Sequence, residues 1–202
     1  MAAPRWNHNF HYHDLLLSMA PLACRAALDV GCGDGTLVGK LAGKAERVVG
    51  IDASHDMIER ASNDVEAGTT LNKSATLIHG DFLSHAFADQ RFDFITCVAT
   101  IHHMDFQAAL ERMKSLLQPR GRIAILGLAR RSTPRDFMYG AAGFVTTRIM
   151  RLTRDCFDPG APIAAPTITY TEVERAASEV LPAASFRRLV LFRYLLTWSK
   201  PG

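Results

Sequence analysis

The sequence predicts an α/β protein built around a doubly wound, mostly parallel sheet. Two observations predict this fold. Short apolar runs alternate with helical segments between residues 26 and 128, and the apolar runs are nearly uninterrupted, as in strands that helices cover on both faces. The chain has 202 residues, of which 48% are hydrophobic. We therefore expect one domain with a buried core over residues 1–202.

The strands and helices of this core follow one another in regular order. The predicted strands are short apolar runs at 26–30, 47–51, 75–79, 92–98 and 122–128. The predicted helices between them cover 36–44, 54–65 and 106–117. Ser54 and Asp105 stand where the N-caps of the second and third helices are expected. The segment 119–121, Pro-Arg-Gly, predicts a turn before the last of these strands.

Both ends of the chain are predicted to add to this core of residues 26–128. Residues 1–25 form an N-terminal segment in which 6–20 are expected to make a helix or lid. Residues 129–170 break the alternation, because they begin helically at Thr133-Pro134 and end in a proline-rich loop over 158–166. The last segment, 171–202, is predicted to contain a helix over 172–180 capped by Thr171. Two strands should follow within 186–199 and separate near 191–193.

The most informative motif directly follows the first strand. Glycines stand at positions 31, 33 and 35, just before the helix that starts at Thr36. Glycine lets the backbone turn sharply and lets a ligand approach it closely, while the N–H groups of a helix N-terminus favour anionic or polar ligand groups. The dinucleotide fingerprint is G-x-G-x-x-G. Here the third glycine falls one place early and Asp29 stands two places before the first, which disfavours a dinucleotide.

Acidic residues follow the next two strands. Asp52 ends the second strand, where a carboxylate can accept hydrogen bonds from both ribose hydroxyls, or can cap the next helix. Asp81 follows the third strand, where it can accept an adenine N–H while Phe82 makes apolar contact. Met57 is either part of the adenine site or a core methionine. The candidate cofactor-binding residues are Asp29, Gly31, Cys32, Gly33, Gly35, Asp52, Ala53, Met57, Asp81, Phe82 and Val98.

A fourth motif makes these signals specific. Residues 92–104 carry the fourth strand, a turn of small residues and the pair His102-His103. Together with Asp29 and the glycines after it, this segment resembles the class I S-adenosylmethionine-dependent methyltransferases of small molecules, over about residues 26–128. The resemblance implies a seven-stranded sheet of order 3-2-1-4-5-7-6 with strand seven antiparallel. It also implies S-adenosylmethionine as cofactor at the carboxyl ends of the strands, and S-adenosylhomocysteine as product.

The implied reaction is a direct displacement at the electrophilic methyl group of a sulfonium. The protein must hold the acceptor atom in line, about 3 Å from the methyl carbon, and exclude water. An amine acceptor needs only to lose a proton, whereas a hydroxyl usually needs a general base, which histidine provides near neutral pH. His102 and His103 are therefore the catalytic candidates, and the resemblance slightly favours His102. Packing or capping beside Asp105 is the alternative role for one of them.

The N-terminal segment is the candidate acceptor side of the site. We predict that His8, His11 and Tyr12 bind the substrate, in a lid that also carries His13 and packs near the open strand ends. A metal site shared with a histidine of the 102–103 pair is the alternative. The spacing is not diagnostic of a metal, and no cysteine or carboxylate joins the histidines, so we expect none.

Charge and composition limit the partners. The net charge of +3 is too small to predict nucleic-acid binding. Residues 130–154 hold six arginines against the single acid Asp136, which indicates either the solvated side of a helix or a cover that steers an acidic substrate. No apolar run approaches the roughly 18 residues of a membrane span, so we expect no membrane partner. Cys32 and Cys97 are expected as buried thiols, and the cytoplasm as the location.

The sequence therefore predicts a methyltransferase that transfers a methyl group to the oxygen or nitrogen of a small-molecule acceptor. Three alternatives stay open. A binding module with the same cofactor pocket could have lost catalysis, an RNA or protein methyltransferase would need a recognition surface, and a NAD-dependent oxidoreductase would need different glycine spacing. The acceptor, the choice among O-, N- and C-methylation, and the oligomeric state do not follow from the sequence.

Overall fold

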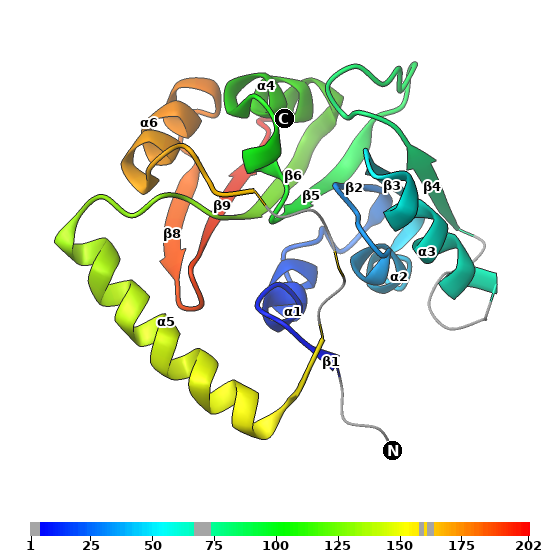
Figure 1. Cartoon of the computed structure of the whole chain (residues 1–202). Coiled ribbons are helices and arrows are strands. Elements are labelled where there is room, and N and C mark those ends of the chain that lie inside the picture. Colours follow the sequence, from blue (N-terminus) through cyan, green and yellow to red (C-terminus); the bar gives the residue numbers. More distant parts are fainter. Residues whose placement is uncertain (1–4, 67–73, 158–159, 161–163) are drawn as a thin grey trace.

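The computed structural model describes residues 5–66, 74–157, 160 and 164–202 (Figure 1). Seven strands of this part form one sheet in the order β4-β3-β2-β5-β6-β9-β8, with β9 antiparallel to both neighbours. These strands are β2 (Cys24–Val30), β3 (Ala45–Asp52), β4 (Ala75–His79), β5 (Phe92–Val98), β6 (Leu117–Gly127), β8 (Ser185–Leu189) and β9 (Arg193–Ser199). Counted along the chain, this is the order 3-2-1-4-5-7-6, so the predicted fold is confirmed.

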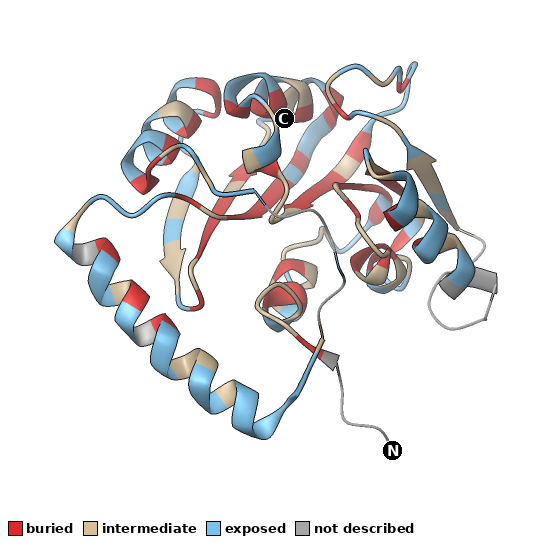
Figure 2. Ribbon diagram, viewed as in Figure 1, coloured by how far each residue is buried: buried red, intermediate tan, exposed pale blue. Residues whose placement is uncertain are grey.

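Helices cover both faces of the sheet, as the uninterrupted apolar strands require. On one face, α1 (His13–Leu17) and α2 (Thr36–Leu41) pack with Leu16 and Leu41 against Val48 and Phe94. α3 (His55–Glu66) lies beside β4, and its Ile58 packs against this same cluster. On the other face, α4 (Phe106–Leu116) and α6 (Tyr170–Val180) bury a second cluster. The central strands are the most buried part of the ribbon (Figure 2). Burying each large apolar side chain contributes about 1.5–3 kcal/mol, which holds the three layers together.

Capping side chains define where the helices begin. The Asp105 carboxylate accepts a hydrogen bond from the Ala108 N–H at 2.7 Å, as predicted. α6 begins earlier than predicted, because Thr169 rather than Thr171 is its cap, and the Glu172 carboxylate accepts a hydrogen bond from the Thr169 N–H. Thr171 also has an acid three residues later, so the sequence offers two capping boxes. Burial of Tyr170 against the core selects the first.

The two turns predicted near the last strands have different outcomes in the structure. The predicted turn at 119–121 lies inside β6, where Arg120 has φ +63° and its N–H donates to the Lys200 carbonyl. The segment is not a turn before the strand but an irregularity within it: Phe92 and Phe94 of β5 pair with Leu117 and Arg122, so the register shifts here. β9 pairs with β6 only from Arg122 to Gly127. The predicted break between the last strands is confirmed: Leu191 and Phe192, both at φ +62°, connect β8 to β9. No glycine marks this turn, although positive φ normally favours one.

The N-terminal segment and the insertion before α6 are joined. β1 (Arg5–Trp6) pairs in parallel with β7 (Asp155–Cys156), and the Phe157 N–H donates to the Trp6 carbonyl at 2.9 Å. The predicted helix over 6–20 is therefore β1, the 3-10 turn η1 (Phe10–Tyr12) and the short α1.

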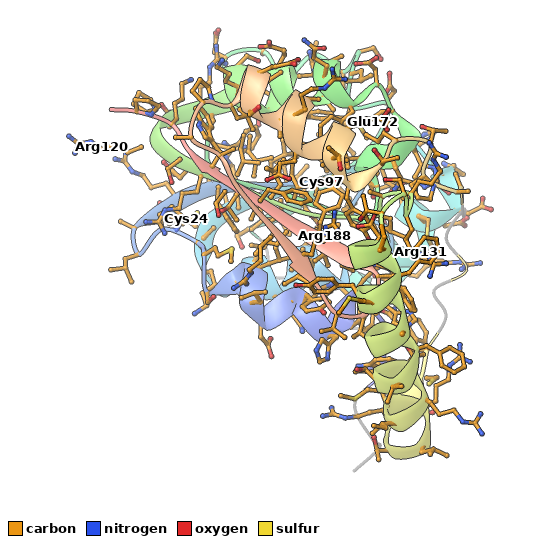
Figure 3. All side chains as sticks on the ribbon, turned by 90° about the vertical axis from the view of Figure 1, so that its left-hand side faces the viewer. Cys24, Cys97, Arg120, Arg131, Glu172 and Arg188 are labelled. Carbon is orange, nitrogen blue, oxygen red and sulfur yellow. The ribbon has the colours of Figure 1, made fainter. Side chains whose placement is uncertain are left out.

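The insertion itself is mostly the helix α5 (Pro134–Thr153), which begins at the predicted Thr133-Pro134 with Thr133 as its cap. It stands away from the sheet (Figures 1 and 3). The predicted proline-rich loop lies partly outside the described residues. Cys32 and Cys97 are buried free thiols, as predicted. Among the described helices, none combines the length and the apolar character needed to cross a bilayer.

Candidate active site

A cavity of about 540 Å³ lies at the carboxyl ends of β2, β3, β4 and β5. Strand order reverses here, because the chain leaves β2 toward β3 and later returns to β5 on its other side. Open α/β sheets place their ligands at this kind of switch point. All but one of the predicted cofactor residues line the cavity, namely Asp29, Gly31, Cys32, Gly33, Asp52, Ala53, Met57, Asp81, Phe82 and Val98. The exception, Gly35, caps α2 with φ +73°.

The glycine loop forms the floor of the cavity. Gly31 and Gly33 have φ of +70° and +54°, the left-handed region that glycine enters without strain. The Gly31 N–H donates to the Ile51 carbonyl at 2.8 Å, which holds the loop against β3. A Cβ on Gly31 would collide with the side chain of Thr100, whereas a Cβ on Gly33 would meet no atom within 4 Å. The lack of a side chain at Gly31 therefore avoids a clash within the protein, whereas the lack of one at Gly33 leaves room for a ligand.

Asp52 connects this loop to the end of β3. One carboxylate oxygen accepts a hydrogen bond from the Gly33 N–H and the other from the Ser54 N–H, each at 2.8 Å. An ionised carboxylate has about four acceptor positions. Asp52 can thus hold the loop in place and still accept two further hydrogen bonds on the cavity side.

Asp29 is the most buried acid of the site, with 2% of its surface exposed. The Thr96 hydroxyl donates to its carboxylate at 2.7 Å. Burial raises the pKa of Asp29 to about 7; the Thr96 hydrogen bond opposes this, and nearby Asp52 and Asp34 add to it. A positive group of a ligand beside Asp29 would favour its ionised form.

The far end of the cavity, after β4, combines one exposed acid with apolar side chains. The Asp81 carboxylate is exposed and accepts hydrogen bonds from the Leu83 N–H and the Ser84 hydroxyl. Phe82 is buried, and so is Met57 at 2% exposure. An acid at the rim of an apolar slot can bind a flat heterocycle that carries a polar edge.

The two catalytic candidates have different surroundings. Both belong to the 3-10 turn η2 (Ile101–His103), with ring centres 4.3 Å apart. His103 is exposed and lines the cavity, whereas His102 is absent from the lining and its Nε2 lies 3.1 Å from the Ala164 carbonyl. Burial, with smaller effects from His103 and Arg193, lowers the pKa of His102 to about 4. The hydrogen bond to a carbonyl assigns Nε2 as the donor, and the lowered pKa makes His102 a neutral imidazole at pH 7. His102 does not line the cavity.

The predicted substrate-binding residues lie in the lid but not on the cavity wall. His8 Nε2 lies 3.0 Å from the hydroxyl of Thr147 in α5. The Tyr12 hydroxyl donates to the Val190 carbonyl, in the turn between β8 and β9. His11 is exposed, with its ring at 4.8 Å from that of Tyr12. His8 and Tyr12 therefore fasten the lid to α5 and to the C-terminal turn, whereas His11 makes ring contacts with Trp6 and Tyr12 inside the N-terminal segment.

Other lid residues reach the cavity, and sequence reasoning did not single them out as binding residues. They are Asn7, Asn9, Phe10 and His13. The three-residue spacing of Phe10 and His13 places both on one side of a helical turn, which was the available signal. Burial, followed by the charge of Lys40, lowers the pKa of His13 to about 4. Its Nδ1 is buried and has no hydrogen-bond partner among the described residues.

A buried arginine fixes Asn9 in the lid. Nε and a terminal nitrogen of Arg193 both donate to the Asn9 side-chain oxygen, at 3.0 and 2.8 Å. Burial lowers the pKa of Arg193 to about 10, which still leaves a cation at neutral pH. Within the described part of the chain, no three His, Cys, Asp or Glu side chains are grouped to hold a metal ion.

Comparison with known proteins agrees with this geometry. A methyltransferase domain model matches residues 27–121. An uncharacterized methyltransferase of Mycobacterium tuberculosis is 31% identical over 97% of this chain and 98% of its own. A demethylmenaquinone methyltransferase of Staphylococcus saprophyticus is 32% identical over 54% of this chain and 46% of its own.

A solved structure extends the comparison to the fold. The N-methyltransferase NodS of Bradyrhizobium japonicum, solved with S-adenosylhomocysteine, superposes with a TM-score of 0.63 at 18% identity, over 96% of this chain and 88% of that one. The strand order, the glycine loop and the full-length relative agree with one another. The chain belongs to the class I methyltransferases, which use S-adenosylmethionine as their methyl donor.

Proposed function

We propose that this enzyme methylates the oxygen or nitrogen of a small molecule in the cavity at the carboxyl end of its sheet. The observation that carries the proposal is the cavity itself, which is walled by the glycine loop, Asp52 and Asp81 and is covered by lid residues. Its volume of about 540 Å³ is in the range of small-molecule sites. Relatives named for demethylmenaquinone and for N-methylation support a small acceptor.

The residues present fit the cofactor. Asp52 has two acceptor positions left for ribose hydroxyls, Asp81 with Phe82 offers a slot for adenine, and the open space at Gly33 admits a ligand against the backbone. Asp29 would face the amino group of the methionine part. When bound, S-adenosylmethionine supplies an electrophilic methyl group. These residues orient that group toward the acceptor.

The acceptor side of the cavity is assigned to the lid and to His103. Phe10 and His13 line this side of the cavity and supply aromatic contact surface for the acceptor. His103 is the general base, because it lines the cavity and is exposed enough to release a proton to solvent. We assign His102 a positioning role, since its ring packs on His103 and its Nε2 contacts the Ala164 carbonyl.

The test is an acceptor screen with purified protein and S-adenosylmethionine, in which S-adenosylhomocysteine release is measured for phenols, hydroxy acids and amines. We expect turnover with at least one class. A thermal-shift comparison of S-adenosylhomocysteine with NAD accompanies it. Stabilisation by NAD alone, or binding of S-adenosylhomocysteine with no turnover of any acceptor, would contradict the proposed function.

With a hydroxyl acceptor, His103→Ala is expected to lower kcat by about 10²–10⁴-fold, the usual contribution of a general base. Affinity for S-adenosylhomocysteine should not change. His102→Ala is the matched variant, because it removes the neighbouring imidazole that does not line the cavity; its kcat should fall much less. Equal losses in both variants, or none in either, would remove His103 from the mechanism. With an amine acceptor, kcat is expected to fall far less in His103→Ala.

Asp29→Asn is expected to weaken S-adenosylhomocysteine binding by roughly 10-fold to 100-fold, which is the value of one charge-assisted hydrogen bond. The asparagine oxygen can still accept from Thr96. In the wild type, affinity should rise with pH as Asp29 ionises near its pKa of about 7. Calorimetric titration at several pH values checks this. The variant should lack the rise, and parallel pH profiles would refute the assignment.

The raised pKa of Asp29 also predicts how the stability of the ligand-free protein changes with pH. The pKa of Asp29 is raised from 3.8 to about 7 in the folded chain. Between these values the folded state retains a proton that the unfolded state has lost. The free energy of unfolding that Asp29 contributes therefore decreases as pH rises through this window. Urea unfolding should show this decrease in the wild type relative to Asp29→Asn, in which the position does not titrate.

A further inference from the structure

One helix carries most of the large apolar side chains that the described residues leave in solvent. Eight such side chains are exposed, and six of them belong to α5. Those six are Phe137, Met138, Phe144, Val145, Ile149 and Leu152, with exposed fractions between 54% and 80%. We call them the outer face of α5. The helix projects beyond the body of the molecule (Figure 3), so no other described element covers this face.

The spacing of these residues places them together. Positions 137, 138, 144, 145, 149 and 152 fall on one side of a helix of 3.6 residues per turn. The opposite side carries the buried residues Asp136, Gly140 and Gly143. α5 thus reverses the usual arrangement of a surface helix, because small and polar residues face the protein and large apolar residues face solvent.

Contacts along its inner side hold α5 in this orientation. Asp136 forms an ion pair with Arg188 of β8, and Gly143 packs against Phe192 in the turn after it. Farther along, the hydroxyl of Thr147 contacts His8. The pairing of β1 with β7 then ties the segment after the helix to the N-terminus. These contacts orient α5 so that its outer face points into solvent.

The charge around this face is positive. Arg131 lies over the Phe137 ring at 5.4 Å, Arg148 is exposed among the apolar residues, and Arg151 and Arg154 are exposed at the far end. The only acid within α5 is Asp136, which is buried and paired. Asp155, exposed directly after Arg154, adds one carboxylate at the far end. A second copy packed on this face would therefore bring together more arginines than carboxylates, which disfavours self-association.

We propose that the outer face of α5 docks the enzyme on the surface of an anionic lipid bilayer. Apolar side chains such as Phe144 and Leu152 would enter the boundary between headgroups and acyl chains, and the guanidinium groups would bind lipid phosphates. This mode needs no membrane-spanning helix. It replaces the sequence-based expectation of no membrane partner, which considered spanning segments alone. The proposal is independent of the acceptor and of the catalytic roles assigned above.

The test is flotation of the full-length protein with vesicles of phosphatidylcholine, with and without phosphatidylglycerol. Binding is expected only to vesicles that contain phosphatidylglycerol, and it should weaken as salt is raised. Phe144→Gln with Leu152→Gln is expected to lower the partition coefficient by about tenfold or more, since both side chains are exposed and outside the core. Arg148→Gln with Arg151→Gln should lower binding to the anionic vesicles and remove most of its salt dependence.

Leu22→Gln is the matched control, because Leu22 is a fully exposed apolar residue outside α5; its binding should equal that of the wild type. Far-ultraviolet circular dichroism and S-adenosylhomocysteine binding establish that each variant is folded. Absence of binding to anionic vesicles, or equal binding by the Phe144/Leu152 variant, overturns the proposal. A dimer in sedimentation experiments that this variant abolishes would assign the face to a second copy and would also overturn it.

Discussion

Asp52→Asn is expected to reduce the affinity for S-adenosylhomocysteine by roughly 10²–10⁴-fold. The loss corresponds to two hydrogen bonds to a charged acceptor, each contributing about 1.5–3 kcal/mol. In the free protein, the two carboxylate oxygens already accept the N–H groups of Gly33 and Ser54. An asparagine amide has only one oxygen, so whichever way it is turned, its NH₂ group faces one of these backbone N–H groups. The substitution therefore disturbs the loop as well as the proposed ribose contacts.

Calorimetric titration of S-adenosylhomocysteine measures this effect, with Asp56→Asn as the control. Asp56 is an exposed acid in the first turn of α3 and does not line the cavity. Both substitutions remove one negative charge from the same region, so a shared loss would reflect charge alone. We expect the control to bind within about threefold of the wild type, because exposed charges interact weakly. Binding by Asp52→Asn close to that of the wild type would exclude Asp52 from the cofactor site.

The cofactor side of the site was predictable because its signals are local and topological. Gly31 and Gly33 follow one strand, Asp52 ends the next and Asp81 follows the third. In a parallel sheet the carboxyl ends of all strands meet at one edge. Positions far apart in the sequence were therefore expected together once the strands were assigned, and the cavity contains all four of these residues.

The lid was less predictable because its orientation depends on distant partners. Which lid side chains point into the cavity is set by the pairing of β1 with β7 and by the contact of Tyr12 with the turn at Val190. These contacts join segments about 150 or more residues apart, and no local periodicity announces them. The sequence therefore indicated a histidine-rich lid but not that His13, rather than His8 or His11, lines the cavity.

Which histidine of the pair His102-His103 lines the cavity was also not predictable from the sequence. Neighbouring residues in a 3-10 turn point in different directions, and the direction depends on where the turn begins. Here Ile101 is buried in the core, which leaves His103 beside the cavity and directs His102 toward the Ala164 carbonyl. Sequence reasoning could not decide which of the two histidines reaches the cofactor, and the resemblance slightly favoured His102, which does not line the cavity.

The arginine-rich insertion was interpreted from charge, whereas its apolar side chains prove more informative. A helix with apolar residues outside and small residues inside has little contrast between its faces, so periodicity alone does not reveal which face is exposed. Only the contacts of Asp136 and Gly143 with the C-terminal hairpin orient it.

Gly31→Ala is expected to destabilise the fold by about 2–5 kcal/mol. Two effects add. An alanine at φ +70° costs roughly 1–2 kcal/mol in the left-handed region, and forcing an extra methyl group into a packed site costs about 1–3 kcal/mol. The new Cβ would collide with Cβ, Oγ1 and Cγ2 of Thr100. Thr100 has little freedom to move away, because its hydroxyl donates to the carbonyls of Gly31 and Val98.

Gly33→Ala is the matched variant because it shares the positive φ but meets open space. It should lose only about 1–2 kcal/mol of stability, while its methyl group occupies the cavity against which the cofactor is proposed to lie. The two variants should therefore differ in the property that changes most. Gly31→Ala should mainly lower the free energy of unfolding measured in urea. Gly33→Ala should mainly lower the affinity for S-adenosylhomocysteine, with a smaller loss of stability. Gly33→Ala with unchanged affinity would mean that the cofactor does not approach this part of the loop. Gly31→Ala as stable as Gly33→Ala would mean that Thr100 yields, and that strain at φ alone limits both positions.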